Sequence, residues 1–442
     1  MSMQLVQQIR FAFLAIAAIW LFAKKAIEIR ANILLGREED YSARKSERWR
    51  QVLLIALGQK KMFRKPLVAL LHFMIYAGFI IINIEVLEIF LDGLFGTHRL
   101  FASGLGSAYL GLINGFEFLA IAVLISCIAF LVRRNVLKLK RFISRDLDGW
   151  PRSDANYILI TEIFLMSFFL TMNAADTLLQ QRGFGHYAAV STGNFYISHL
   201  LHPLIGGLSN SQLLILERTC WWLHILGIFA FLNYLPYSKH LHIILAFPNA
   251  YFSRLWPKAE MKNMPQVQQE VLYAMKPESV PTTTETAQHG KFGAKDIFDL
   301  SWRNLLDAYS CTECGRCSAA CPATQTGKKL SPRKIMMDTR DRMEDIRTNM
   351  KNNGEFKDDG KALLHNYITD EELRACTSCQ ACVQECPVNI SPLEIILELR
   401  RYLVMEESNA PQEWNAMFSN IENNFAPWKF SPDERDQWAK QV

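Results

Sequence analysis

The chain has 442 residues, of which 50% are hydrophobic, and its formal net charge is +5 at pH 7. The basic residues gather between apolar runs and do not alternate with aromatic residues as in a nucleic-acid groove, so we expect no nucleic-acid partner. The length suffices for two or three domains. Residues 1–257 are mainly apolar and later residues mainly polar, which predicts a membrane domain followed by soluble parts.

Five apolar segments are long enough to cross a bilayer, which takes about 20 residues. They are Leu5–Ala23, Leu67–Phe90, Tyr109–Val132, Tyr157–Leu179 and Leu213–Leu235. Lys24 and Lys25 follow the first segment instead of preceding it, and no A-x-A cleavage site follows the apolar run. We therefore expect an uncleaved helix and not a signal peptide.

The distribution of basic residues predicts the orientation of these helices. Residues 24–65 and 133–145 are rich in Lys and Arg, whereas residues 92–107 and 180–212 are nearly devoid of them. Short loops rich in Lys and Arg face the cytoplasm. We therefore expect an outside N-terminus and a multi-pass protein of the bacterial cytoplasmic (inner) membrane.

Four histidines lie in or just after the predicted helices. His72 lies in the second helix near its cytoplasmic end, and His224 lies near the middle of the fifth. His240 and His242 follow Pro236; if the helix continues past this proline, His242 shares a face with His224, because the 18 residues between them make five turns. Histidine inside a bilayer costs free energy and is a functional candidate, although a single one is often a hydrogen-bonded core residue.

The soluble part begins with polar residues 258–291, a predicted linker with a short helix around Val267–Ala274. Residues 292–405 predict a helical domain, with helices at Lys334–Arg347, Thr369–Cys376 and Ser391–Met405. Residues 406–442 form a tail, for which packing onto this domain and docking of a partner both remain open. Its aromatic residues are Trp414, Phe418, Phe425, Trp428 and Trp438.

Eight of the ten cysteines form two runs that each read C-x2-C-x2-C-x3-C-P. They are Cys311, Cys314, Cys317 and Cys321, and then Cys376, Cys379, Cys382 and Cys386. This spacing is typical of [4Fe–4S] ligation, in which the fourth cysteine of a run reaches the other cluster. One zinc ion would leave half the thiolates over, and disulfides need an oxidising compartment. The sequence therefore predicts two [4Fe–4S] clusters, in a domain that faces the cytoplasm.

In a protein that also binds iron–sulfur clusters, these histidines favour b-type haem. By depth, His72 and His242 both lie near the cytoplasmic side and are expected to hold one haem, with His224 serving a second haem deeper in the bilayer. The alternative is a single haem held by His72 and His224. His240 is a fourth candidate ligand.

Three stretches resemble known families. WWLHILGIFAFLNYLPYSKHLHIILAFPN at Trp221–Asn249 and KPLVALLHFMIYAGF at Lys65–Phe79 resemble the nitrate reductase gamma-like cytochrome b family, whose relatives include membrane subunits of heterodisulfide reductase and of dissimilatory sulfite reductase complexes. This resemblance implies five helices, an outside N-terminus and capacity for two haems, but Ile82 stands where a second histidine of the second helix is expected. YSCTECGRCSAACPATQTGKKLSPRKI is similar to the alpha-helical ferredoxin domain of heterodisulfide reductase C-type and succinate dehydrogenase iron–sulfur subunits, over about residues 299–403.

These patterns predict an all-α protein with a five-helix transmembrane bundle followed by a cytoplasmic alpha-helical ferredoxin domain. No two cysteines are adjacent and no G-x-G-x-x-G follows a strand. We therefore expect a separate cytoplasmic redox subunit, either a CCG-motif cysteine-rich protein or an electron-transfer flavoprotein. The predicted function is electron transfer between that partner and membrane (mena)quinone, through two [4Fe–4S] clusters and one or two b-type haems. The alternative is a membrane-anchored redox sensor or assembly protein that uses the same centres without turnover.

Carboxylates gather toward the outer half of the predicted helices, at Glu85, Glu88, Glu117, Asp176 and Glu217. Charged groups at such depth usually face the bundle interior and often handle protons. Because quinone reduction consumes protons, Glu85, Glu88 and Glu117 are candidates for a quinone or proton site. The alternative is that these carboxylates are solvated at the interface, which fits Asp176 and Glu217 best.

Overall fold

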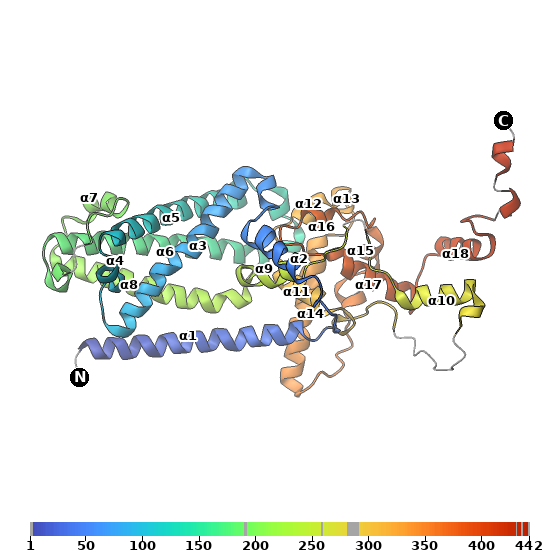
Figure 1. Cartoon of the computed structure of the whole chain (residues 1–442), viewed down its shortest axis with the longest axis horizontal. Helices are drawn as coiled ribbons and strands as arrows, with labels where there is room; N and C mark the ends of the chain where they lie inside the picture. Colours follow the sequence, from blue (N-terminus) through green and yellow to red (C-terminus); the bar gives the residue numbers. More distant parts are fainter. Residues whose placement is uncertain are drawn as a thin grey trace.

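The computed structural model describes residues 3–189, 192–257, 260–280, 291–429, 431–434 and 436–440. Within these ranges the chain forms helices and turns and no β-strand, which confirms the predicted all-α fold. Five helices are long and apolar enough to cross a membrane. They are α1 (Met3–Ile33), α3 (Pro66–Phe95), α5 (Ser107–Leu131), α6 (Trp150–Gln181) and α8 (Asn210–Tyr234). Figure 1 shows them lying beside one another on the left, with the C-terminal domain on the right.

The long helices pack around a common apolar core. Helix α6 packs against α5 and α8, and α3 packs against α5, while α1 contacts α3 and α8. Phe11 of α1 is 1% exposed, and its ring lies 5.5 Å from that of Phe90. Helices α1 and α3 approach closely because Gly93 has no side chain: a Cβ there would lie 2.8 Å from the Phe11 ring.

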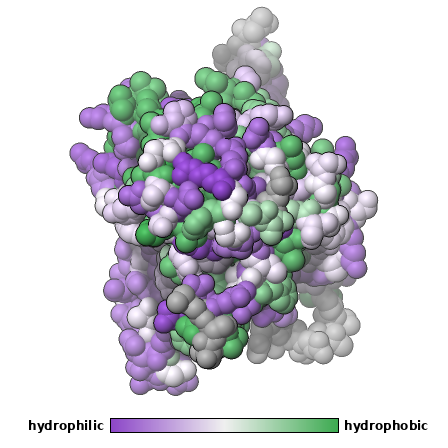
Figure 2. Space-filling model, turned by 90° about the vertical axis from the view of Figure 1, so that its left-hand side faces the viewer, coloured by the Kyte–Doolittle hydropathy of each residue, from purple (hydrophilic) through white to green (hydrophobic). Residues whose placement is uncertain are grey.

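The lipid-facing sides of the bundle are apolar. Large hydrophobic side chains are strongly exposed along the long helices, including Phe13, Ile125, Phe164 and Ile215. Such contiguous apolar exposure is rare on soluble monomers. Figure 2 looks onto the end of the bundle that lies far from the C-terminal domain, where hydrophilic residues occupy the middle of the face among hydrophobic ones. The chain is therefore a membrane protein with an apolar belt.

The fifth long helix does not continue past Pro236, so His224 and His242 do not lie on one face of the same helix. Helix α8 ends at Tyr234, two short 3-10 turns follow, and α9 (His242–Tyr251) begins a new helix. Proline cannot donate to the helical ladder and its ring clashes with the preceding turn, which explains the break. The positions of these histidines relative to each other are thus set by tertiary packing.

The C-terminal domain is built from short helices around one apolar core. Its helices are α11 (Trp302–Ser310), α12 (Arg316–Ala320), α13 (Pro322–Gln325), α14 (Pro332–Asn353), α15 (Asp370–Ala375), α16 (Ala381–Glu385) and α17 (Pro392–Met405). Helix α14 contains the predicted Lys334–Arg347, and the hydroxyl of its N-cap residue Ser331 accepts from the backbone N–H of Lys334. The Thr369 and Glu372 side chains form a capping box at the start of α15.

Two further helices have no buried residues. Helix α10 (Pro265–Met275) overlaps the short helix predicted in the linker, of which residues 258, 259 and 281–290 lie outside the described residues. Helix α18 (Gln412–Asn424) in the tail has no buried residue, and Figure 1 shows it apart from the other helices of the C-terminal domain. The five aromatic side chains of the tail are all exposed: Trp414, Phe418, Phe425, Trp428 and Trp438.

The membrane bundle and the C-terminal domain are joined by specific contacts near the end of α1. The Asn32 side-chain amide donates to the Tyr309 hydroxyl at 2.7 Å. The backbone N–H of Arg37 donates to the Leu300 carbonyl at 2.7 Å, and that of Trp302 donates back to the Arg37 carbonyl at 3.0 Å. Only glycine fits at position 36, where a Cβ would lie 2.7 Å from the Trp302 nitrogen. These contacts fix the two parts relative to each other.

Candidate redox-centre sites

The first cysteine group is drawn from both runs. One cavity in the C-terminal domain is lined by Cys311, Cys314 and Cys317 of the first run and by Cys386, the last cysteine of the second. Cys386 follows the short helix α16 in an extended conformation, with φ −67° and ψ 123°, and Pro387 comes next. The structure thus groups three cysteines of one run with the fourth of the other.

The second group is complementary. Cys321 and Cys379 lie close enough to Cys376 and Cys382 for their thiolate charges to add to the burial that raises the pKa of these two thiols. Cys321 precedes Pro322 at the start of α13, in an extended conformation like that of Cys386. Cys379 is exposed, so this group lies nearer the surface than the first.

Without metal, these thiols favour the protonated form. Burial raises the pKa of Cys311, Cys382 and Cys386 to about 12 each. Thiolates here therefore need a cationic partner, which the irons of a cluster provide. Backbone N–H groups already point at two sulfurs, from Ser378 to Cys376 at 3.4 Å and from Ile390 to Cys386 at 3.3 Å. Such bonds to sulfur tune cluster potentials.

Among the described residues, no three His, Cys, Asp or Glu side chains are close enough to hold a single metal ion. Four of the eight cysteines line a cavity.

A larger cavity of about 440 Å³ lies inside the bundle, between α3, α5, α6, α8 and α9. All four predicted histidines line it: His72, His224, His240 and His242. The cavity continues to the cysteine loops, because both cavities share the residues Thr312, Glu313, Cys314, Arg316, Pro387 and Val388. The histidine cavity and the first cysteine group are therefore separated only by these loops.

Three of the four imidazoles are held in one tautomer. The Nδ1 of His224 lies 3.0 Å from the Leu165 carbonyl oxygen, and the Nδ1 of His242 lies 3.0 Å from the Lys239 carbonyl oxygen. A carbonyl only accepts, so each Nδ1 carries the hydrogen and each Nε2 is left bare. The Nδ1 of His72 lies 3.1 Å from Oε1 of Gln59 and is oriented the same way. Metal-binding histidines typically show this second contact.

His240 is held differently. Its ring packs 5.3 Å from the Phe231 ring and 5.6 Å from the His242 ring. Burial, together with the neighbouring charges of His242 and His72, lowers its pKa to about 3. His72, His240 and His242 are thus close together at the end of the cavity near the cysteines, whereas His224 contributes nothing to that shift and lies apart.

Positive side chains surround this end of the cavity. Arg141, Lys239 and Arg316 line it, and the ammonium of Lys239 lies 2.5 Å from a carboxylate oxygen of Glu313. Lys239 and Arg340 together hold the pKa of Glu313 below its usual value against the opposing effect of burial. The lining therefore keeps a net positive charge beside the cysteine loops.

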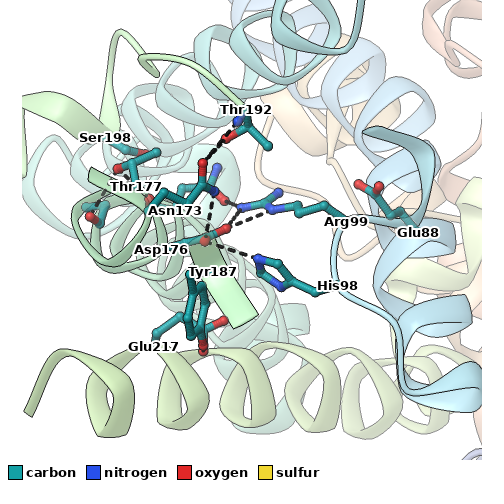
Figure 3. A network of polar contacts seen from close by, with 12 residues as sticks. Glu88, His98, Arg99, Asn173, Asp176, Thr177, Tyr187, Thr192, Ser198 and Glu217 are labelled. Atoms are coloured by element: carbon teal, nitrogen blue, oxygen red, sulfur yellow. Dashed lines mark hydrogen bonds and ion pairs between the residues drawn. The ribbon is translucent and has the colours of Figure 1, made fainter. Parts of the chain in front are cut away.

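At the opposite end of the bundle, the outer carboxylates take part in a network centred on Arg99 (Figure 3). Arg99 is 6% exposed; its Nη2 lies 2.8 Å from Asp176 and 2.6 Å from the Asn173 side-chain oxygen. His98 points at Asp176 from the same loop, at 3.2 Å. Asp176 and Glu217 are both 1% exposed, so the expected solvation of these two at the interface is wrong: α6 and α8 bury them beside polar partners.

The three predicted quinone or proton carboxylates differ in their contacts. Glu88 accepts from the Tyr109 hydroxyl at 2.7 Å, and from the backbone N–H of Phe101 in the short helix α4 (Leu100–Leu105) at 2.8 Å. Glu117 accepts backbone N–H groups of Ile197 and Ser198 at 3.0 and 3.1 Å. Glu85 is 1% exposed, and neither of its oxygens has a hydrogen-bond partner among the described residues; its nearest cation is Arg99 at 3.7 Å. Glu88 and Glu117 therefore anchor outer segments, and Glu85 does not.

The comparisons with known proteins identify the cysteine domain. Residues 307–390, which contain all eight cysteines, match the 4Fe-4S dicluster domain family. The chain is 27% identical over 461 residues to the probable iron-sulfur-binding oxidoreductase FadF of Bacillus subtilis, covering 98% of this chain and 60% of the relative. It is 27% identical over 454 residues to EtfAB:quinone oxidoreductase of Syntrophomonas wolfei, covering 98% and 57%.

A third relative matches a shorter part of the chain. A component of the ferredoxin/F(420)H(2)-dependent CoB-CoM heterodisulfide reductase from Methanosarcina acetivorans is 35% identical over 120 residues, covering 27% of this chain and 60% of the relative. No solved structure matches the chain. The chain thus spans about 60% of the length of the first two relatives. The iron–sulfur part of the sequence prediction is confirmed; haem and quinone binding stay predictions.

One cavity residue escaped the sequence reasoning. Glu162 of α6 lines the histidine cavity, and within the described ranges it makes no hydrogen bond and no ion pair. The available signal was its place near the middle of the fourth predicted helix, Tyr157–Leu179, where a carboxylate is costly. It went unnoticed because the other carboxylates cluster toward the outer half.

Proposed function

We propose that this protein is the membrane electron-transfer subunit of a quinone oxidoreductase complex. It passes electrons between a redox partner at the C-terminal domain and (mena)quinone in the membrane, through two [4Fe–4S] clusters and b-type haem. One observation carries the proposal: a cavity lined by four cysteines and a cavity lined by four histidines share the same two loops. Electron transfer requires redox centres to be close, and this arrangement brings the two kinds of ligand together.

In this proposal each cluster takes three thiolates from one cysteine run and the fourth from the other. Cys311, Cys314, Cys317 and Cys386 hold the cluster nearer the bundle, and Cys321, Cys376, Cys379 and Cys382 hold the outer one. The exposed Cys379 makes the outer cluster the point of electron exchange with the partner.

For haem, the pair His72 and His242 fits best. Both imidazoles have Nδ1 anchored and Nε2 bare, and both lie at the end of the cavity near the cysteine loops. The positive side chains Arg141, Lys239 and Arg316 suit the two carboxylates of a haem at this end. When bound, haem iron supplies reversible one-electron transfer between the clusters and quinone. His224 and His240 are the remaining candidate ligands, in line with the two-haem and single-haem alternatives.

The orientation follows from charge. Arg- and Lys-rich segments lie at the end of the bundle that carries the C-terminal domain, which supports a cytoplasmic cluster domain and an outside N-terminus. In this proposal, residues 1–257 form the membrane domain that holds haem and quinone, and residues 292–405 form the domain that holds the clusters.

We further propose Glu85 as a proton-handling group, with Glu88 and Glu117 holding the outer segments around it. The partner would be an electron-transfer flavoprotein or a CCG-motif protein; the name of the Syntrophomonas relative supports the first.

The test is a redox titration of the purified chain in detergent or nanodiscs. Iron, acid-labile sulfide and pyridine haemochrome analysis should give two clusters and at least one haem per chain. Dithionite reduction followed by a menaquinone analogue should reoxidise the haem. Cluster signals without any haem absorbance would overturn the electron path, and haem that a quinone never reoxidises would favour a sensor.

A further inference from the structure

The histidine cavity has two chemically different ends. The end near the cysteine loops carries His72, His240, His242 and the positive side chains described above. The other end reaches Ile82, Asn83 and Val86 of α3 and contains His224 and Glu162. Apart from the helix backbone, its lining is mainly apolar, with a few polar groups, which is the usual make-up of a site for a small organic ligand.

Glu162 and His224 are brought to this end by the packing of α6 on α8. The His224 ring is anchored to the carbonyl of Leu165, which lies three residues after Glu162 on α6 and hence on the same helical face. Glu162 lies twelve residues after the start of α6 at Trp150, about 18 Å along the helix. His224 lies ten residues before the end of α8, about 15 Å along it, so both groups lie at a similar depth.

The groups that face Glu162 leave its charge uncompensated. From α5 the neighbour is Cys127, and the cavity wall also supplies His224 from α8 and Tyr76 from α3. No lysine, arginine or hydrogen-bond donor pairs with Glu162 within the described part of the chain. An unpaired carboxyl at such depth is expensive, and the membrane proteins that keep one use it to move protons or to face a ligand.

We infer that the end of the cavity at Glu162 and His224 binds the quinone head group, and that Glu162 gives it protons. This inference rests on the proposed function. A quinone takes up two electrons from the reduced centres of this chain and two protons to become a hydroquinone. The Glu162 carboxyl passes its proton to a quinone oxygen, is reprotonated from the aqueous phase, and supplies the second proton in the same way. The bare Nε2 of His224 accepts a hydrogen bond from the resulting hydroxyl.

The experiment uses the full chain with its clusters and haem, in nanodiscs that contain a menaquinone analogue. The variants are Glu162→Gln, Glu162→Asp and, as a matched control at an exposed position of the same helix outside the cavity lining, the volume-conserving Ile160→Leu. We expect Glu162→Gln to keep wild-type haem content and haem spectrum while reoxidation of reduced haem by the quinone slows about 100-fold, in the range of lost acid–base catalysis. Glu162→Asp should recover part of the rate, and Ile160→Leu should behave as wild type.

Two readouts separate this role from a structural one. Redox-induced infrared difference spectra should show the carbonyl band of a protonated carboxylic acid in the wild type and not in Glu162→Gln. His224→Gln should keep its haem, because in this inference His72 and His242 hold the haem and His224 does not, and it should bind the quinone analogue more weakly. Wild-type reoxidation in Glu162→Gln, or loss of haem in either Glu162→Gln or His224→Gln, would overturn the inference. A wild-type chain that lacks haem, or whose haem no quinone reoxidises, would instead overturn the proposed function.

Discussion

Arg333 joins the first cysteine loop to the membrane bundle, and its replacement should destabilise that junction strongly. The guanidinium is 1% exposed and pairs in bidentate fashion with Asp146, with Nη2–Oδ1 at 2.6 Å and Nε–Oδ2 at 2.9 Å. It also donates to the Arg141 carbonyl at 2.8 Å and contacts the Glu313 carbonyl at 3.4 Å. Asp146 belongs to the loop between α5 and α6, whereas Glu313 belongs to the cysteine loop.

The expected cost follows from burial. Removing one partner of a buried ion pair leaves the other charge uncompensated, which costs about 3–5 kcal/mol. For a domain of about 100 residues, each kcal/mol lowers the unfolding midpoint by about 4–8 °C, so Arg333→Met should lower it by about 12–40 °C. Asp146→Asn should act similarly, and the double variant should fall short of the sum because the two residues share one interaction.

The effect should also depend on pH. Arg333 and the neighbouring hydroxyls hold the pKa of Asp146 below its usual value, overcoming the opposite effect of burial. A carboxyl with a lowered folded-state pKa stabilises the fold above its unfolded-state pKa, and that stability is lost as pH falls through the folded-state value. The destabilisation by Arg333→Met should therefore be full near pH 7 and shrink in acid.

The assay is thermal loss of cluster absorbance in the purified chain, at several pH values. The control is Lys329→Met, which breaks an ion pair to Glu371 in the same domain whose side chains are 67% and 60% exposed. Exposed pairs of this kind are weak, so this variant should melt as the wild type does. If Arg333→Met and Lys329→Met melted alike, the assignment of Arg333 as a buried anchor would be refuted.

Three further predictions test the redox sites and the outer network. Cys386→Ser should remove the same cluster signal as a variant of the first run, and Cys321→Ser should remove the other signal; electron paramagnetic resonance of the reduced protein reads this directly. His242→Ala should lose haem, whereas His240→Ala should keep it, because only the former has an anchored Nδ1; pyridine haemochrome analysis decides. Arg99→Met should lower the thermal midpoint of the bundle, because it leaves buried carboxylates unpaired, a cost of about 3–5 kcal/mol; circular dichroism during heating measures it.

The sequence predicted the elements of this protein well, because their signals are local. Apolar runs of membrane length and a Ser-Pro pair before α14 act within a few residues, and the structure contains the corresponding helices. Helix ends were harder. Helix α1 continues ten residues past Ala23 to Ile33, since Lys25 is neutralised by Glu28 and Glu344 and no breaker precedes Gly36. The ion pair between Lys25 and Glu344 joins α1 to α14, and such a long-range contact cannot be predicted from the sequence around Lys25.

For the candidate sites too, local features could be predicted from the sequence, whereas features set by tertiary packing could not. The cysteine spacing predicted that the fourth cysteine of each run joins the other group, because each Cys-Pro turn is a local constraint. The depth of a histidine was also readable, but its neighbours were not: Pro236 ends α8, and the packing of α9 decides that His242 lies near His72. Glu162 was missed and Asp176 was misjudged for a related reason. Whether a carboxylate in a helix meets a cation, a cavity or solvent depends on the partner helix.

Asn249 offers a last test of how the bundle and the cysteine loops are coupled. Its side-chain amide is fully buried, donates to the Val388 carbonyl at 2.7 Å and accepts from Nη1 of Arg303 at 3.0 Å. Val388 lines both cavities, so this hydrogen bond holds the shared loop against α9. Asn249→Ala leaves a buried carbonyl and a buried guanidinium without this partner, at about 1–3 kcal/mol for each group.

We expect Asn249→Ala to retain both clusters and haem but to slow haem reduction by dithionite-reduced clusters, because the loop between the two cavities is no longer fixed. Stopped-flow absorbance at the haem band, normalised to haem content, gives the rate. Gln51→Ala is the matched control, since it removes only a 3.4 Å contact to Asn389 on the same loop. Equal rates in the two variants would show that the Asn249 bond does not couple the centres, and the shared loop would then be a boundary between two independent sites.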